Sequence, residues 1–252
     1  MRLVTVGTGT AAPHPLRVQS SLYLEADDVR LLVDCGSAAV FRLASLGLPW
    51  QELTHVAITH FHADHTSDLA TLLFAWRHGM LPPRQAPVTI LGPTGISDLL
   101  ARHAAALGAS MLEAVPGLRI EELVPGTPVE LGDTMTLEAR KVPHTDESVA
   151  YSVSAKGRRV VVTGDTAFDP ELAQWARGCD VFVCECSLPE VLALPTHLTP
   201  RQCGELAATV QPGLLALTHF YPPVESVDIV AEVRERFGGN VVMCHDGWEH
   251  EI

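Results

Sequence analysis

One stretch of six residues constrains this chain more than any other: residues 60–65 read His-Phe-His-Ala-Asp-His. The stretch directly follows a short apolar run, residues 56–59, that predicts a β-strand. Because side chains alternate along a strand, the first two histidines point to one side, and the aspartate and the last histidine can turn in from the loop that follows. Three imidazoles and a carboxylate, without a thiolate, are ligands that suit zinc. The stretch therefore predicts a metal site at the end of a strand.

Further candidate ligands lie far downstream. Four ligands this close together cannot all bind one metal that stays open to a substrate, so other residues must contribute. Three polar residues each follow a predicted strand, as the six-residue motif does: His144, Asp165 and His219. Each would be an ordinary polar residue on its own, but together with the motif they supply enough ligands for two metals. The sequence thus predicts a two-metal site assembled from strand ends.

The rest of the chain predicts many short strands with helices between them. β-Branched runs predict strands over residues 3–6, 21–25, 29–33, 56–59, 88–91, 135–142, 149–154, 160–163, 181–184, 214–218 and 241–244. Apolar periodicity predicts helices over residues 68–78, 94–107 and 224–237, and a capping box from Thr199 to Gln202 predicts the start of another. We therefore expect layered sheets flanked by helices. No stretch reads as a linker, so a single domain over residues 1–252 is expected.

An internal similarity suggests two related halves. Residues 31–34 and 58–61 read Leu-Leu-Val-Asp and Ile-Thr-His-Phe, and residues 161–165 and 217–220 read Val-Val-Thr-Gly-Asp and Leu-Thr-His-Phe. Chance similarity between short strand ends is the alternative explanation.

Charge and composition exclude several classes of protein. The 252 residues hold 17 Lys and Arg against 30 Asp and Glu, a net charge of −13 with histidine neutral. Nonspecific binding to nucleic acid or anionic lipid depends on clustered positive charge, so neither is expected. No apolar run has the length of a membrane helix, and the first run is too short for a signal peptide. Six cysteines without a CxxC pair predict reduced, mostly buried thiols and a cytoplasmic location.

Taken in order, these motifs resemble the metallo-β-lactamase-fold hydrolases: His-Phe-His-Ala-Asp-His, a lone histidine, Gly-Asp-Thr at residues 164–166 and Thr-His-Phe at residues 218–220. The resemblance implies an α/β fold, the four-layer αββα metallo-β-lactamase sandwich. It also implies two zinc ions, with manganese as the alternative metal. The implied ligands are His60, His62 and His144 for one metal, Asp64, His65 and His219 for the other, and Asp165 as a bridge between them.

Two more motifs resemble the ribonuclease Z branch and the phosphodiesterases related to it. Residues 6–13 read Val-Gly-Thr-Gly-Thr-Ala-Ala-Pro, similar to the start of that branch, and Thr-His-Leu-Thr-Pro at residues 196–200 resembles its extra histidine motif. Ribonuclease Z carries a long basic arm that grips transfer RNA, whereas a short hairpin fills the corresponding gap here. Transfer RNA is therefore not expected as a substrate. The pattern is similar to the small cyclic phosphodiesterases of the phosphonate pathway, without their Cys-rich structural zinc site.

These features predict a phosphodiesterase that acts on small, including cyclic, phosphodiesters through a metal-bridging hydroxide. Asp64 and Asp165 would hold the nucleophile, and His197 would stabilise the phosphoryl oxygens and protonate the leaving oxygen. Glu185 lies between two cysteines of a predicted strand and so faces away from both. We expect it to form a hydrogen bond with His197 and to favour the protonated ring.

Other functions remain open on the same residues. They are hydrolysis of a lactone, thioester or sulfate ester, ribonuclease Z-type RNA cleavage, and a non-catalytic metal-binding protein. A strained lactone needs no leaving-group acid, so His197 would then be idle. Seven ligands over two metals leave room for water and substrate, which favours catalysis over a structural site. A small anionic ester is the expected partner, a homodimer is implied by the resemblance alone, and the sequence leaves open whether His14 or Trp76 contacts the substrate.

Overall fold

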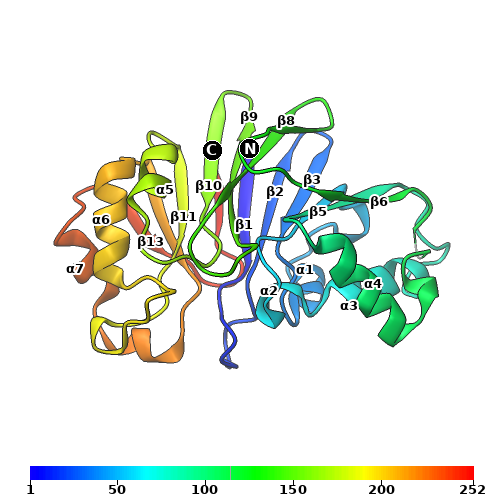
Figure 1. Cartoon of the computed structure of the whole chain (residues 1–252), viewed down its shortest axis with the longest axis horizontal. Helices are drawn as coiled ribbons and strands as arrows, with labels where there is room; N and C mark the ends of the chain where they lie inside the picture. Colours follow the sequence, from blue (N-terminus) through cyan, green and yellow to red (C-terminus); the bar gives the residue numbers. More distant parts are fainter. Residues whose placement is uncertain (114) are drawn as a thin grey trace.

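Two mixed sheets lie face to face in the computed structural model, which describes residues 1–113 and 115–252, and helices cover the outer faces (Figure 1). Within these residues the strands of the first sheet are, in spatial order, β14 (Glu249–Glu251), β1 (Arg2–Gly7), β2 (Ser21–Ala26), β3 (Val29–Val33), β4 (His55–Ala57), β5 (Val88–Gly92) and β6 (Leu118–Glu122). Those of the second sheet are β13 (Val241–Met243), β12 (Leu214–Thr218), β11 (Val181–Glu185), β10 (Arg158–Val162), β9 (Val149–Ala155), β8 (Met135–Lys141) and β7 (Val129–Leu131).

The helices divide between the two outer faces. Those that follow strands of the first sheet are α1 (Ala39–Ser45), α2 (Ala63–Thr66), α3 (Leu69–His78) and α4 (Ile96–Leu107). Those that follow strands of the second sheet are α5 (Pro170–Trp175), α6 (Pro200–Val210) and α7 (Ile229–Arg234). Short 3₁₀ turns span Trp50–Glu52, Ala109–Met111, Glu190–Leu192 and Pro222–Ser226. Figure 1 shows α1, α3 and α4 on one side of the paired sheets and α5, α6 and α7 on the other.

Strand alternation sorts the core into three layers. In β3, Leu31 and Val33 pack between the two sheets, whereas Leu32 packs against the helices of the first sheet. In β11, Val183 faces the other sheet and Phe182 faces the helices of the second sheet. The α/β class and the four-layer αββα sandwich predicted from the sequence are thus confirmed.

Most predicted elements are present, but some boundaries were wrong. The predicted helix over residues 224–237 is a 3₁₀ turn followed by the short α7, because Val227 is extended and the Asp228 side chain caps a new helix at the Ala231 amide. The capping box at the start of α6 is confirmed. Polar edge strands such as β6 and β14 carry little apolar signal and were missed. All six cysteines are free and buried, as predicted.

Both halves of the chain repeat one topology. β1 to β5 and β8 to β12 each form two antiparallel pairs followed by two parallel pairs. The residues that correspond between the two halves differ from those matched in the sequence. Asp34 N donates to the end of β4 and Thr163 N to the end of β11, at 2.8 and 3.0 Å, so Asp34 corresponds to Thr163 and not to Asp165. His219 follows β12, the counterpart of β5, so its proposed match with His60 was wrong.

The carboxyl ends of the parallel strands lie at one edge of the two sheets. Ligands of α/β proteins bind preferentially at such edges. Glu185 is the last residue of β11, and the other predicted site residues lie beyond the strand ends or in the adjoining loops. Among the residues that the structure describes, no helix is long and apolar enough to span a bilayer.

Candidate metal centre

The six-residue motif forms the turn from β4 into α2. His62 is extended directly before α2, and Asp64 and His65 lie in the first turn of that helix. The motif is held against the segment that follows β3, because the Cys35 amide donates to the His65 carbonyl at 2.8 Å. Gly36 allows this close approach, since a Cβ atom there would lie 2.1 Å from the Asp64 carbonyl oxygen. The sequence therefore folds the motif into a rigid turn and not a flexible loop.

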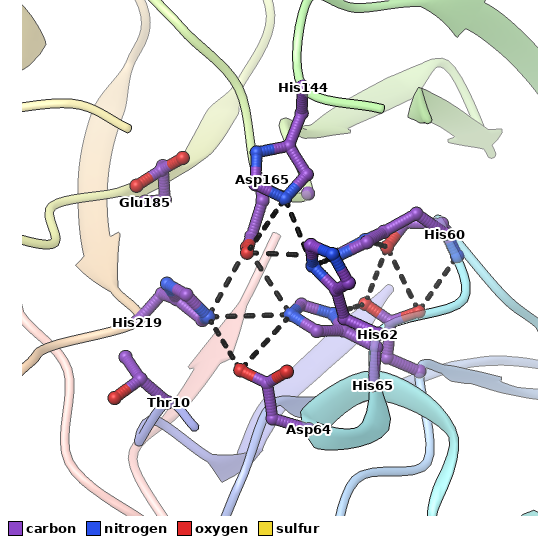
Figure 2. A network of polar contacts seen from close by, with 12 residues as sticks. Thr10, His60, His62, Asp64, His65, His144, Asp165, Glu185 and His219 are labelled. Carbon is purple, nitrogen blue, oxygen red and sulfur yellow. Dashed lines mark hydrogen bonds and ion pairs between the residues drawn. The ribbon is translucent and has the colours of Figure 1, made fainter. Parts of the chain in front are cut away.

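Seven predicted ligands meet at one place (Figure 2). They form two groups in which the ligand atoms lie within 4.8 Å of one another: His60, His62, His144 and Asp165 in one, and Asp64, His65 and His219 in the other. Five of the seven residues are buried. His62 is exposed, and His144 is partly exposed although its side chain is buried. The structure thus brings together residues from four separate segments of the chain.

Asp165 lies between the two groups. Its Oδ1 is 3.3 Å from both His65 Nε2 and His219 Nε2. Its Oδ2 is 3.7 Å from His60 Nε2 and 3.8 Å from His144 Nε2. One carboxylate oxygen therefore faces each group, as a bridging ligand would require.

The outward nitrogens of four histidines have hydrogen-bond partners of their own. They are His65 Nδ1 with Asp34 Oδ2 at 2.7 Å, His144 Nδ1 with the Thr196 carbonyl at 2.9 Å, His219 Nδ1 with Ser187 Oγ at 3.0 Å, and His60 Nδ1 with Thr59 Oγ1 at 3.1 Å. A ring that donates from its outer nitrogen turns a lone pair toward the centre. These partners orient the rings as metal ligands.

The site has the chemistry of a divalent metal centre. Asp165 Oδ1 is buried and forms no hydrogen bond with the residues that the structure describes, and a buried carboxylate oxygen is costly without a cation. Burial, with the positive charge of His65 beside it, lowers the pKa of His60 to about 2, so this ring is neutral as a ligand must be. Burial alone would raise the pKa of Asp64, but its hydrogen bond with His219 prevails and lowers the pKa to about 2. A neutral His60 and an ionised Asp64 fit zinc or manganese. Burial opposes protonation of His65, but the Asp165 and Asp34 carboxylates outweigh it and raise the pKa of His65, so a bound metal would displace a proton from this ring.

His219 is held in an unusual backbone conformation. Its φ is +59°, in the left-handed region that residues other than glycine rarely adopt. Ser187 Oγ donates to its carbonyl at 3.2 Å, and the Phe220 amide donates to the Thr8 carbonyl at 3.0 Å. The surrounding loops therefore hold the turn that directs the His219 ring toward Asp64 and Asp165.

Comparison with known proteins places this site in a family. Residues 29–220 match the family model described as the beta-lactamase superfamily domain. The chain belongs to the beta-lactamase superfamily. It is a metal-dependent hydrolase of the metallo-β-lactamase fold.

Relatives and solved structures of the superfamily cover nearly the whole chain. An uncharacterized protein of Mycobacterium leprae (strain TN) is 30% identical over 100% of this chain and 89% of its own length. A ribonuclease Z of Mycobacterium avium (strain 104) is 27% identical over 88% of this chain and 86% of its own length. The metallo-β-lactamase fold protein YhfI from Bacillus subtilis superposes with a TM-score of 0.86 at 22% identity, covering 99% of this chain and 98% of that one.

Two other solved structures share the fold. The short form of human tRNase Z has a TM-score of 0.81 at 23% identity, covering 100% of this chain and 99% of that one. A diphosphatase of the PhnP family has a TM-score of 0.71 at 18% identity, covering 100% of this chain and 97% of that one.

One further histidine of this superfamily member, His197, has a ligand atom within 4.8 Å of those of Asp165 and His219, which makes a third group of possible ligands. His197 Nδ1 lies 3.1 and 3.2 Å from the two Glu185 carboxylate oxygens, so the predicted hydrogen bond is confirmed. Glu185 is buried and faces away from Cys184 and Cys186, which pack against the helices. Burial opposes protonation of His197, but the hydrogen bond with Glu185 and the nearby carboxylates outweigh it and raise the pKa of His197.

Sequence reasoning missed several residues around the centre. Asp34 orients His65, and Ser187 lies two residues beyond Glu185 on the same face and bonds to His219. The Tyr221 ring packs edge-on against His197 and His219, with centroids 5.9 and 6.0 Å apart. The sequence signal that could have indicated Tyr221 is its position two residues after the predicted ligand His219.

Three other residues lie at or near the site. Figure 2 shows the buried Thr10 beside Asp64 and His219. His14 Nε2 lies 3.4 Å from Glu225 Oε2. Trp76, on α3, is fully buried in the core, so its ring is a core contact.

Proposed function

We propose that this superfamily member is a two-zinc phosphodiesterase that cleaves a small anionic phosphodiester, including cyclic ones, with manganese as the alternative metal. His60, His62 and His144 would hold one metal and Asp64, His65 and His219 the other, with Asp165 between them. When bound, divalent metals supply a nucleophile at neutral pH and neutralise charge on phosphoryl oxygens.

One observation carries the proposal: His197 lies close enough to Asp165 and His219 to form a third group of possible ligands with them, but its Nδ1 is bonded to Glu185. The His197 ring lies 4.9 Å from that of His144 and 5.8 Å from that of His219. The opposite nitrogen, Nε2, is therefore the atom that can donate to a phosphoryl oxygen and then protonate the leaving oxygen. Glu185 orients the ring for both tasks and favours its protonated form.

Tyr221 supports the same chemistry. Burial and the nearby Asp64 and Asp165 charges raise the pKa of Tyr221 to about 12, so the phenol stays protonated at neutral pH. Its hydroxyl forms no hydrogen bond with any residue in the described part of the chain. It is therefore available to donate to an anionic substrate oxygen.

The short connection between the ligands favours a small substrate. Between His144 and Asp165 the chain forms only the β9–β10 hairpin with its Lys156-Gly157 turn. Together with the net charge of −13, this leaves no basic arm to grip transfer RNA. The relative named ribonuclease Z makes RNA cleavage the alternative to test, whereas the PhnP-family diphosphatase shares the fold with a substrate class closer to the proposed one.

The test compares substrates and one variant. Zinc-loaded protein is assayed on bis-aryl and cyclic phosphodiesters, lactones, thioesters, sulfate esters and precursor transfer RNA. The His197→Ala variant should retain the bound zinc of the wild type and lose about 10²–10⁴-fold in phosphodiester turnover. The exposed His245→Ala variant serves as control and should match the wild type.

Two outcomes would refute the proposal. A decrease below threefold in His197→Ala would exclude the role given to His197. Preferential turnover of lactones or RNA would exclude the proposed substrate class. The homodimer implied by the family resemblance and the cytoplasmic location also remain proposals, and light scattering of the purified protein measures the first.

A further inference from the structure

Asp246 lies in the turn between β13 and β14, outside both ligand groups, yet its carboxylate is unusually well coordinated by donors. The side chain is only 3% exposed. Oδ1 accepts from the Thr8 amide at 3.0 Å and from Thr8 Oγ1 at 2.7 Å. Oδ2 accepts from the Val18 amide at 2.7 Å and lies 3.3 Å from Arg42 Nη2. The donors all lie within the first 42 residues and are thus far from Asp246 in the sequence.

Two of these donors close the base of one loop. The chain leaves β1 at Thr8 and returns at Val18, and Figure 1 shows this dark blue loop projecting from the edge of the sheets. The Gly9 amide donates to the Val18 carbonyl at 2.8 Å. Gly7 permits the tight pairing, because a Cβ atom there would lie 1.8 Å from the Gln19 carbonyl oxygen. Asp246 thus holds both arms of the loop together and anchors them to α1 through Arg42.

The loop in turn holds His219. The Thr8 carbonyl accepts from the Phe220 amide at 3.0 Å, directly after the left-handed residue His219. Arg17 strengthens this connection, since Nη1 donates to Thr8 Oγ1 at 2.7 Å and the guanidinium lies 4.7 Å from the centroid of the Phe220 ring. A residue in a strained conformation keeps it only when its surroundings impose it. Displacement of Thr8 would therefore release the His219 turn.

Only one of the two ligand groups depends on this connection. His219 Nε2 lies 3.5 Å from Asp64 Oδ2 and 3.3 Å from Asp165 Oδ1. His60 and His62 are positioned by the β4–α2 turn, and His144 by its bond to the Thr196 carbonyl. We infer that Asp246 is a positioning residue for the Asp64–His65–His219 metal site, acting through Thr8 and Phe220 on His219. The inference rests on the two-metal site of the proposed function.

The experiment measures zinc affinity in each site separately. In a His62→Ala background the Asp64–His65–His219 site is left intact, and in a His219→Ala background the His60–His62–His144 site is left intact. Asp246→Asn is added to each background, and Zn²⁺ alone is titrated against a chromophoric chelator. Loss of a residue that orients a metal ligand typically weakens affinity about 10–100-fold. We expect that loss in the His62→Ala background and a change below about threefold in the His219→Ala background.

A matched control separates positioning from general destabilisation. Asp180 also accepts from a backbone amide and an arginine, at Arg159 N and Arg158 Nη1, both 2.8 Å away, but it precedes β11 at the end opposite to Glu185. Asp180→Asn should leave zinc affinity unchanged in both backgrounds. Urea unfolding of each variant reports overall stability independently.

Three results decide the inference. A loss below threefold in the His62→Ala background, or equal losses in both backgrounds, would overturn it. Failure of the wild type to bind two zinc ions would instead refute the two-metal proposal. Should Asp246→Asn not fold, Thr8→Val removes the hydroxyl that donates to Asp246 and accepts from Arg17 Nη1, and it should weaken the same site about threefold or more, the effect of one or two hydrogen bonds. No weakening in that variant would also overturn the inference.

Discussion

The two halves of the molecule place a buried carboxylate and a buried threonine at corresponding strand ends, but in opposite order. In the first half Asp34 follows β3 and Thr59 follows β4. In the second half Thr163 follows β10 and Glu185 ends β11. The same hydrogen bond joins each pair: Thr59 N donates to Asp34 Oδ1 at 2.8 Å, and Glu185 N donates to Thr163 Oγ1 at 3.1 Å.

Each carboxylate orients one histidine, and the two histidines have different surroundings. Asp34 Oδ2 lies 2.7 Å from His65 Nδ1, and Glu185 Oε2 lies 3.1 Å from His197 Nδ1. The opposite nitrogen of His65 faces Asp165 and His219 within a ligand group. In the proposed mechanism, the opposite nitrogen of His197 contacts the substrate. Under the proposed function, the same carboxylate–histidine arrangement would serve metal binding in one half and proton transfer in the other, depending on what the opposite nitrogen contacts.

Removal of the first carboxylate should have the largest effect. Asp34→Ala leaves the Thr59 amide, the Thr59 hydroxyl and His65 Nδ1 without their acceptor in a buried place. We expect a loss of about 3 kcal/mol or more in the free energy of unfolding of the metal-free protein. Metal affinity should also fall about 10–100-fold, because His65 loses its orientation. Urea denaturation and zinc titration measure the two effects.

The control for this variant is an exposed aspartate of the same half. Asp28→Ala, in the β2–β3 turn, should change the free energy of unfolding by less than about 0.5 kcal/mol. Wild-type zinc affinity in Asp34→Ala would show that the ligand group does not need its orienting carboxylate, and the comparison of the two halves would lose its basis.

The second carboxylate should affect turnover and not metal binding. Glu185→Gln keeps the size of the side chain but replaces one acceptor of His197 by an amide donor. We expect phosphodiester turnover to fall about 10–100-fold with an unchanged zinc content. Glu190→Gln, an exposed position at the start of the 3₁₀ turn Glu190–Leu192 whose carboxylate accepts from Thr199 Oγ1, should keep wild-type turnover.

Glu185 also contacts Ser187, which bonds to His219, so the variant distinguishes two roles. Loss of bound zinc in Glu185→Gln would mean that Glu185 acts through Ser187 on the metal site. The two carboxylates would then have the same function, and the proposed difference between the halves would be wrong.

The candidate ligands could be predicted from sequence because each has a local signal. The motif at residues 60–65 is contiguous, and His144, Asp165 and His219 each follow an apolar run. Asp34 also follows such a run, but its role depends on His65 folding back over it, a contact between segments 31 residues apart. Thr163 has no polar pattern of its own. Residues that act through the pairing of distant strands leave no periodicity to detect.

The same limit explains why the residues of the two halves were matched wrongly. Two apolar runs were aligned because both end in Thr-His-Phe. In the folded chain, the strand order makes Glu185 the counterpart of Thr59. Local similarity cannot distinguish the second parallel strand of a half from the third, because both end at the same edge of the sheet. The existence of two related halves could therefore be suggested from the sequence, but the correspondence of individual residues could not be predicted.

The threonines allow the finest test of the comparison. Thr163→Val leaves the buried Glu185 amide without an acceptor, which should cost about 1–3 kcal/mol of stability. Thr59→Val removes a hydroxyl donor from Asp34, which keeps the Thr59 amide and His65, so about 1 kcal/mol is expected. The ranking follows because an unpaired buried donor is worse than one hydrogen bond fewer at a carboxylate.

Zinc binding should rank the two variants the other way. Thr59 Oγ1 lies 3.1 Å from His60 Nδ1, so Thr59→Val also frees the ring of a candidate ligand, whereas Thr163 contacts none of the ligand rings among the described residues. Thr59→Val should therefore weaken zinc binding a few-fold and Thr163→Val should not. Urea denaturation and chelator competition on the same two proteins give both rankings. If the same variant loses more stability and also more zinc affinity than the other, the two hydroxyls do not have the separate roles, in stability and in metal binding, that the comparison of the halves implies.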